Sequence, residues 1–149
     1  MAKGFLSEEF DDCVSKGRIK KFPAARSLAA KEMKAAEDDL AVASESLKKG
    51  QAKWATVQAY YAMFHAARAL IYSKGYREHS HYCLVIAVKA LFVAERLLDV
   101  ELVEELQLAK TLRENADYDN EFSKASAQSL LKKAQQWVER SKKILLVKS

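Results

Sequence analysis

The most apolar stretch of the chain runs from Trp54 to Lys74, with the sequence WATVQAYYAMFHAARALIYSK. It contains no Gly and no Pro, and apolar residues occur on nearly every side of the helix that it would form, which is typical of a helix surrounded by others. Four of its polar side chains recur at steps of four, three and four, so they share one face. These residues are Tyr61, His65, Arg68 and Tyr72. The pattern predicts a buried central helix over about 52–74 that carries one polar row.

A heptad-like pattern precedes the central helix, over about 23–49. Its apolar residues alternate steps of four and three, as in helices that pack along a seam. Pro23 suits the first turn of this helix, and Gly50 is a natural stop. Because only a few residues link it to the central helix, the two should be antiparallel neighbours. The seam consists of Ala29, Met33, Ala36, Leu40, Ala43 and Leu47.

Polar caps and apolar periodicity predict four further helices in the rest of the chain. They lie at about 7–16, 80–97, 99–115 and 124–146, and the polar segment 116–123 is predicted to be a loop.

We therefore expect one all-α domain over residues 1–149, an up-and-down bundle of four to five helices. Within it, residues 7–22 would form a short N-terminal helix and a basic connector, and residues 23–147 would form the bundle.

Half of the residues are hydrophobic, and only four Gly and one Pro are present, which also favours few, long helices. The net charge of +5 is concentrated in two clusters near the ends of the chain. Such clusters can contact phosphate groups, although a solvated helix face is the simpler interpretation. The first cluster is Lys16, Arg18, Lys20, Lys21 and Arg26, and the second is Lys132, Lys133, Arg140, Lys142, Lys143 and Lys148.

The two cysteines, Cys13 and Cys83, lie far apart in the sequence and show no metal-binding spacing. We expect both to be free, buried thiols in a reducing cytoplasm. No apolar run is long enough for a membrane span, and the N-terminus lacks the apolar run of a signal peptide. The sequence predicts a cytoplasmic protein with no membrane partner, bound metal or cofactor.

His65 and Arg68 are the first candidate binding residues. An unpaired charge in a helical core is very costly, so Arg68 requires a partner. In one interpretation the partner is a carboxylate from another helix, assisted by a hydroxyl of Tyr61 or Tyr72. In the other, His65 and Arg68 line a cleft or a dimer interface, where they could contact a ligand.

A second candidate site lies in the turn GYREHSH, just before the helix predicted at 80–97. Free backbone N–H groups at a helix start, together with Arg77 and His81, would suit a phosphate. The alternative is a plain helix cap by Ser80. His79 and His81 stand two residues apart, and no metal-ligand pattern includes them.

The third candidate is the segment LRENADYDN, residues 112–120. Arg113 and Asp117 are four residues apart and could pair along a helix end, and Tyr118 follows directly. In one interpretation this is a helix end closed by an ion pair and a turn. In the other, an arginine with nearby carboxylates meets a phosphodiester.

Four segments occur along the chain in the order GRIKKF, QAYYAMFHAARALIYSKGY, SHYCLV and LRENADYDNEFS. In this order they resemble the small prokaryotic members of the HEPN superfamily, over about residues 5–147. The YYAMFHAARAL segment and the Arg113…Ala116-Asp117-Tyr118 segment are the most specific parts. The resemblance implies a homodimeric helical bundle in a prokaryotic cytoplasm. It also implies a nucleotidyltransferase partner in a toxin–antitoxin pair.

HEPN ribonucleases carry an Arg followed a few residues later by a His, often with a Tyr just beyond, and they cut RNA without metal. The resemblance implies that Arg113 is this Arg, which would orient the phosphate. The chain departs from the motif, because no His occurs in residues 114–149, and Asp117 and Tyr118 stand in its place. Asp, with an unperturbed pKa of about 3.9, is a poor proton donor at neutral pH. In some relatives the nucleotidyltransferase modifies the motif Tyr. The resemblance implies that Tyr118 is the counterpart of that Tyr.

The sequence leaves three functions open. The departure from the motif favours a non-catalytic HEPN module that binds RNA, a nucleotide or a nucleotidyltransferase. The second is a metal-independent ribonuclease, in which Arg113 and Asp117 meet His65 or His81 in a dimer cleft. The third is a structural dimerisation protein whose long apolar helices supply the contact surface.

Overall fold

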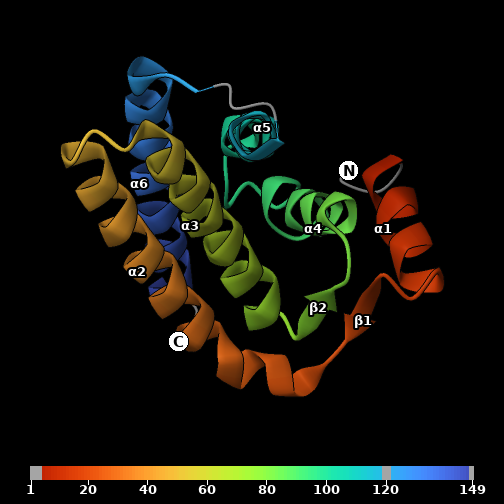
Figure 1. Ribbon diagram of the computed structural model, residues 1–149. Coiled ribbons are helices and arrows are strands. Elements are labelled where there is room, and N and C mark those ends of the chain that lie inside the picture. Colours follow the sequence, from red (N-terminus) through yellow and green to blue (C-terminus); the bar gives the residue numbers. More distant parts are fainter. Residues whose placement is uncertain (1–4, 119–121, 148–149) are drawn as a thin grey trace.

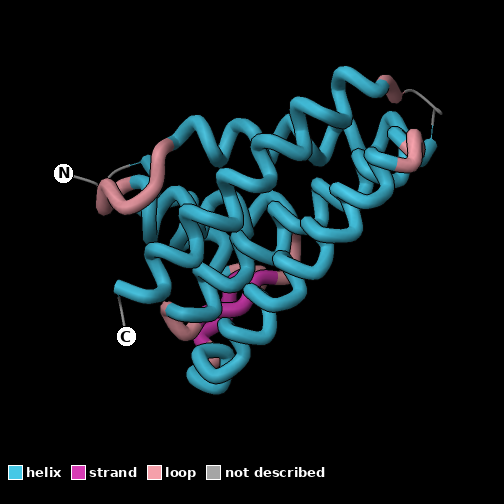
Figure 2. Tube along the Cα trace, turned by 90° about the vertical axis from the view of Figure 1, so that its left-hand side faces the viewer, coloured by secondary structure: helices cyan, strands magenta, loops and turns pink. Residues whose placement is uncertain are grey.

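The computed structural model of the protein describes residues 5–118 and 122–147. The all-α prediction is confirmed, since the two short strands are a small part of an otherwise helical chain (Figure 2). The helices are α1 (Phe5–Ser15), the 3-10 helix η1 (Pro23–Leu28), α2 (Ala29–Lys48), α3 (Ala52–Ser73), α4 (His81–Val88), the π-helical turn η2 (Lys89–Val93), α5 (Val100–Tyr118) and α6 (Lys124–Val147), and the strands are β1 (Ile19–Lys21) and β2 (Tyr76–Glu78).

Helix α3 is the central element, as the apolar stretch at 54–74 predicts. It lies between α2 and α6 on one side and α4 and α5 on the other (Figure 1). Five of its alanines, spaced at steps of four and three, are completely buried, so neighbouring helices can approach closely. These are Ala55, Ala59, Ala62, Ala66 and Ala69. Gly50 adopts a positive φ of 75° in the short link that turns α2 back into α3.

The predicted basic connector and the GYREHSH turn are not plain loops. They contain β1 and β2, which pair antiparallel with Ile19 opposite Glu78. Ile19 is fully buried, and Gly75 makes the turn out of α3 with a φ of 82°. Strands of three residues are too short to show an alternating pattern, so periodicity could not predict them.

Three helix boundaries also differ from the prediction. The helix expected at 23–49 begins as η1 and becomes α-helical only at Ala29, and the one expected at 80–97 changes to a π-helical turn after Val88. The loop predicted at 116–123 was wrong at its start, because α5 continues to Tyr118. Residues 119–121 of that loop lie outside the described residues.

The prediction of free thiols was wrong. Cys13 and Cys83 form a disulfide that joins α1 to α4, with their Cα atoms 5.9 Å apart. The pairing of β1 with β2 brings α1 back beside the start of α4, and Tyr82 donates a hydrogen bond to Glu9 of α1 at 2.9 Å. The two cysteines are 70 positions apart in the sequence, so their spacing could not reveal the contact. None of the described helices is long and apolar enough to cross a membrane.

Candidate functional site

The structure sorts the predicted site residues into two groups beside α3. The first, here called the Arg68 network, consists of Glu32, Asp39, His65, Arg68, Tyr72 and Glu78. The second, here called the Arg113 cluster, consists of Tyr60, Tyr61, His81, Lys110, Arg113, Glu114 and Asp117.

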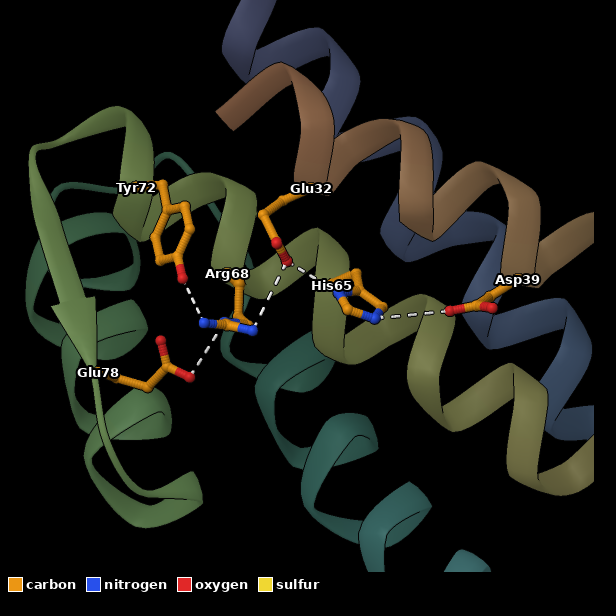
Figure 3. Close-up of polar contacts among 6 residues, drawn as sticks. All are labelled: Glu32, Asp39, His65, Arg68, Tyr72 and Glu78. Carbon is orange, nitrogen blue, oxygen red and sulfur yellow. Dashed lines mark hydrogen bonds and ion pairs between the residues drawn. The ribbon is translucent and has the colours of Figure 1, made fainter. Parts of the chain in front are cut away.

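The Arg68 network links α2, α3 and β2 (Figure 3). The guanidinium of Arg68 lies between Glu78, whose Oε2 is 3.2 Å from Nε, and Glu32, whose Oε1 is 3.9 Å from Nη1. Arg68 also donates a hydrogen bond to the hydroxyl of Tyr72. Arg68 therefore has the carboxylate partners that a half-buried charge needs, and Tyr72 rather than Tyr61 is the hydroxyl beside it.

His65 occupies the other end of the same network. Its Nδ1 lies 2.8 Å from Oε1 of Glu32, and its Nε2 lies 3.7 Å from Oδ2 of Asp39 (Figure 3). Both carboxylates come from α2, so His65 and Arg68 attach α3 to α2 at adjacent turns. These contacts use both ring nitrogens of His65 within the protein itself.

Burial and charge act in opposite directions on the carboxylates of the Arg68 network. Burial alone would raise the pKa of Glu32, but the hydrogen bond with His65 and the charge of Arg68 together lower it. Burial raises the pKa of Glu78, which Arg68 only partly offsets. Burial also raises the pKa of Asp39. Glu78 is thus the carboxylate of the network that depends most on its arginine for staying ionised.

The Arg113 cluster brings α3, α4 and α5 together. The guanidinium of Arg113 lies over the rings of Tyr60 and Tyr61, 5.2 and 5.8 Å from their centroids. Its Nη1 donates a long hydrogen bond of 3.5 Å to the Tyr61 hydroxyl and lies 3.6 Å from Oδ2 of Asp117. The imidazole of His81, at the start of α4, stacks on Tyr60 with 6.1 Å between ring centroids.

His81 is the most perturbed titratable residue of this cluster. Burial, with a further contribution from the charge of Lys110, lowers the pKa of His81 from 6.5 to about 4, so the ring is neutral at neutral pH. Its Nε2 is buried and has no hydrogen-bond partner among the described residues, and the same holds for Nε of Arg113. A hollow of about 240 Å³ opens beside His81. Its lining consists of His81, Tyr82, Val85, Gln107 and Lys110.

The other predicted residues lie apart from both groups. Arg77 is exposed on β2 and its guanidinium lies 5.8 Å from the ring centroid of Phe22. Ser80 caps α4 by accepting a hydrogen bond from the backbone N–H of Cys83 at 3.1 Å, so the helix start is already capped. Tyr118 is 76% exposed at the end of α5.

Several residues of the two groups were not predicted. Lys110 precedes Arg113 by three residues and Asp117 by seven, so helical spacing could have placed it on the same face of α5. Glu32 and Glu78 carry no such signal, because they reach Arg68 from separate elements. Within the ranges that the structure describes, no three His, Cys, Asp or Glu side chains are grouped as metal ligands.

Comparison with known protein families matches residues 29–145 of the chain to the HEPN domain. The chain belongs to the HEPN family. Two relatives come from the archaeon Methanocaldococcus jannaschii. The protein named "Putative toxin MJ0142" is 33% identical over 98 residues, which cover 64% of this chain and 67% of that protein. "Putative toxin MJ0605" is 29% identical over 111 residues, 74% of this chain and 83% of that protein.

The HEPN match begins at Ala29, the first residue of α2. It therefore contains the Arg68 network and the Arg113 cluster completely. Helix α1, β1 and η1 precede it, so the disulfide joins a segment outside the matched HEPN domain, through Cys13, to one inside it, through Cys83.

Proposed function

We propose that this HEPN protein is the toxin-like member of a two-protein pair and that it binds an RNA or nucleotide phosphate at the Arg113 cluster. The names of the two archaeal relatives support the toxin-like role. The observation that carries the binding role is a hollow lined by His81 and Lys110, in the same cluster as Arg113, whose guanidinium lies over two tyrosine rings.

The chemistry of the cluster suits a nucleotide unit. Arg113 and Lys110 supply cationic donors for a phosphate, and the neutral ring of His81 adds a nitrogen that has no partner within the described part of the chain. The rings of Tyr60 and Tyr61 hold the guanidinium of Arg113, 5.2 and 5.8 Å from their centroids, so this cation is already positioned before a phosphate binds. The carboxylates that pair with the two cations, Glu114 and Asp117, belong to α5 itself and are partly exposed. An incoming phosphate can therefore displace them without separating helices.

Binding of a short fluorescent single-stranded RNA, followed by anisotropy, tests this function. We expect Arg113→Ala to weaken binding by about tenfold or more, because a charge-assisted contact to phosphate is lost. Arg140→Ala is the matched control, since it removes the same charge from an exposed position on α6. Equal losses in both variants would indicate unspecific attraction, and no binding by the wild-type protein would refute the proposal.

For the second protein of the pair we propose a nucleotidyltransferase, the class that the resemblance implies. The exposure of Tyr118 makes its hydroxyl accessible to such an enzyme. Incubation with a partner nucleotidyltransferase and ATP should add one adenosine monophosphate to the peptide that contains Tyr118, with release of pyrophosphate. Tyr118→Phe should abolish the mass increase, and an unmodified wild-type chain would contradict the pairing.

We also propose that the protein forms a homodimer. Val100 and Leu108, eight residues apart on α5, are both exposed apolar side chains of the helix that carries Arg113. A second copy covering them would remove both apolar side chains from water. Light scattering at micromolar concentration should give the dimer mass, and a monomer would count against this arrangement.

A metal-independent ribonuclease is a second candidate function, favoured by the position of His81 in the Arg113 cluster. The neutral imidazole could accept the proton of a 2′-hydroxyl as its oxygen attacks the phosphorus, while Arg113 stabilises the charge on the phosphate. The bond from phosphorus to the 5′-oxygen then breaks, and the imidazolium returns its proton to that oxygen, which gives a 2′,3′-cyclic phosphate and a 5′-hydroxyl. Cleavage of total RNA in the presence of EDTA that is lost in His81→Ala would support catalysis. Intact RNA after incubation with the wild-type protein would rule it out and leave the binding role.

A further inference from the structure

A groove of about 750 Å³ opens on a face of the protein that the proposed function does not use. It lies where η1 and the start of α2 face the C-terminal ends of α3 and α6. Small and apolar side chains form its trough, among them Ala29, Ala30, Met33 and Leu145. Its volume is in the range of pockets that bind small molecules.

A second hollow of about 350 Å³ adjoins one end of this groove. The two share Arg26 and Lys74, and the second hollow adds Lys21 and the backbone around Gly75. Lys21 and Arg26 belong to the N-terminal basic cluster of the sequence, and Lys142 of the C-terminal cluster lines the groove as well. The fold therefore brings two basic segments from opposite ends of the chain to one surface.

The charges along the groove are unevenly balanced. Within the described residues, Lys34 pairs with Asp38 at 3.1 Å and Lys142 pairs with Glu37 at 2.7 Å. Arg26 and Lys74, in contrast, have no carboxylate of the described chain within ion-pair distance. The groove is thus an apolar trough with a concentrated positive charge at one end.

The cations at this end are held in place by packing. Nε of Arg26 lies 3.2 Å from the position that a Cβ atom on Gly75 would occupy, so the arginine rests against the backbone at the end of α3. Nζ of Lys74 lies 5.5 Å from the ring centroid of Phe92. Both positions are near the C-terminal end of α3, where the helix dipole stabilises cations.

We propose that this groove binds a free anionic amphiphile, a small molecule with an aliphatic chain that ends in one phosphate or carboxylate. The chain would lie in the trough beside Met33 and Leu145, and the anionic group would contact Arg26 and Lys74. An RNA strand or an acidic helix would need cations distributed along the groove, whereas the cations without partners are gathered at its end. The site is separate from the Arg113 cluster, whose tyrosines belong to the N-terminal half of α3.

Calorimetric titration of the purified protein with decyl phosphate, below its critical micelle concentration, tests the proposal. We expect saturable binding with one site per chain. Inorganic phosphate should bind far more weakly, because it lacks the aliphatic chain. Decyltrimethylammonium should also bind far more weakly, because its charge is repelled by Arg26 and Lys74. Equal binding of the cationic and anionic probes would overturn the proposal.

Single substitutions locate the site. Lys74→Ala and Arg26→Ala should each weaken decyl phosphate binding by about tenfold. Ala30→Glu, which places a carboxylate at the exposed edge of the trough, should weaken it further. Lys132→Ala removes an exposed cation from α6 away from the groove and should leave binding unchanged. Because Arg26 also packs against the end of α3, Lys74→Ala and Ala30→Glu decide the outcome if Arg26→Ala does not fold.

Two further comparisons separate this inference from other interpretations. Vesicles that contain phosphatidylglycerol should not compete with decyl phosphate for the groove. Preferential binding to the vesicles would indicate that the groove binds a membrane surface and not a free amphiphile. Arg113→Ala should bind decyl phosphate like the wild-type protein. Equal affinity of the wild-type, Lys74→Ala and Ala30→Glu proteins for decyl phosphate would refute the groove site whatever the result of the RNA experiment.

Discussion

Arg68 and Arg113 have similar surroundings in the same protein. Arg68 lies over the rings of Phe64 and Tyr72, and Arg113 lies over those of Tyr60 and Tyr61. Each guanidinium also lies beside a tyrosine hydroxyl and two carboxylates. The origin of the carboxylates is what distinguishes them.

The carboxylates of Arg68 come from other elements, Glu32 from α2 and Glu78 from β2. Those of Arg113 are Glu114 and Asp117, from its own helix. The side chains of Glu78 and Glu32 are 7% and 17% exposed, whereas those of Asp117 and Glu114 are 26% and 40% exposed. Long-range, buried partners hold elements together and are costly to remove, but local, exposed partners contribute little to stability and can give way to a ligand. We therefore expect Arg68 to stabilise the fold, and Arg113 to be better suited than Arg68 to binding a ligand.

The largest expected effect that tests this comparison is that of Arg68→Ala. It leaves Glu78 buried without its cation, so we expect the free energy of unfolding to fall by about 3–5 kcal/mol. Arg113→Ala should cost only about 1 kcal/mol, because its partners are near solvent. Urea denaturation of both variants measures the difference.

The double variant Arg68→Ala/Glu78→Gln is the control for this mechanism. Removing the charge of Glu78 should recover a substantial part of the lost stability. If Arg113→Ala were as destabilising as Arg68→Ala, the distinction between long-range and local partners would not hold.

The second largest effect concerns the disulfide that connects α1 to the helix carrying His81. Cys13→Ser should lower the free energy of unfolding by about 2–4 kcal/mol, because the unfolded chain regains the freedom of a loop of about 70 residues. Dithiothreitol should destabilise the wild-type protein by a similar amount and leave Cys13→Ser unchanged. Urea denaturation with and without reductant measures both, and equal sensitivity of the two proteins would contradict a structural disulfide.

The helices were largely predictable because their signals are local. The apolar seam from Ala29 to Leu47 and the all-round apolar character of α3 both extend over several helical turns, and each turn supports the same assignment. Boundaries were less certain where the helix type changes, at η1 and η2. The three-residue strands and the Cys13–Cys83 bond could not be read, because each depends on residues that meet only after folding.

The candidate sites show the same division. Arg113 and Asp117 were predictable as a pair from their spacing on one helix, and their family motif drew attention to them. Nothing in the spacing of His81, Tyr60 and Arg113 indicates that they meet, since they come from three helices. The partners of Arg68 could be predicted as carboxylates, from the cost of a buried charge, but not as Glu32 and Glu78.

A smaller effect is expected from the pH dependence of His81. Its pKa is about 4 in the folded chain and about 6.5 in the unfolded chain, so between these values the unfolded state binds more protons. The contribution of His81 to stability is complete above about pH 6.5 and falls as the pH decreases towards 4.

Since solvent reaches part of the ring, we expect His81 to account for a loss of about 1 kcal/mol between about pH 7 and pH 5. Urea denaturation of wild-type protein and His81→Gln at both pH values isolates this contribution, because all other titrating groups are shared. A pH dependence that is the same in both proteins would show that His81 is not shielded. The Arg113 cluster would then be more open to solvent than its geometry indicates.

The smallest effect compares the two tyrosine hydroxyls. Tyr61→Phe removes an acceptor 3.5 Å from Arg113, at the limit of a hydrogen bond, and should cost about 0.5 kcal/mol or less. Tyr72→Phe removes the acceptor of a close hydrogen bond from Arg68 within the tighter network and should cost about 1 kcal/mol. Urea denaturation measures both, and RNA anisotropy adds an independent readout.

If Tyr61 helps to present Arg113 to a phosphate, Tyr61→Phe should weaken RNA binding about twofold while Tyr72→Phe leaves it unchanged. The reverse order would move the ligand-binding role from Arg113 to Arg68.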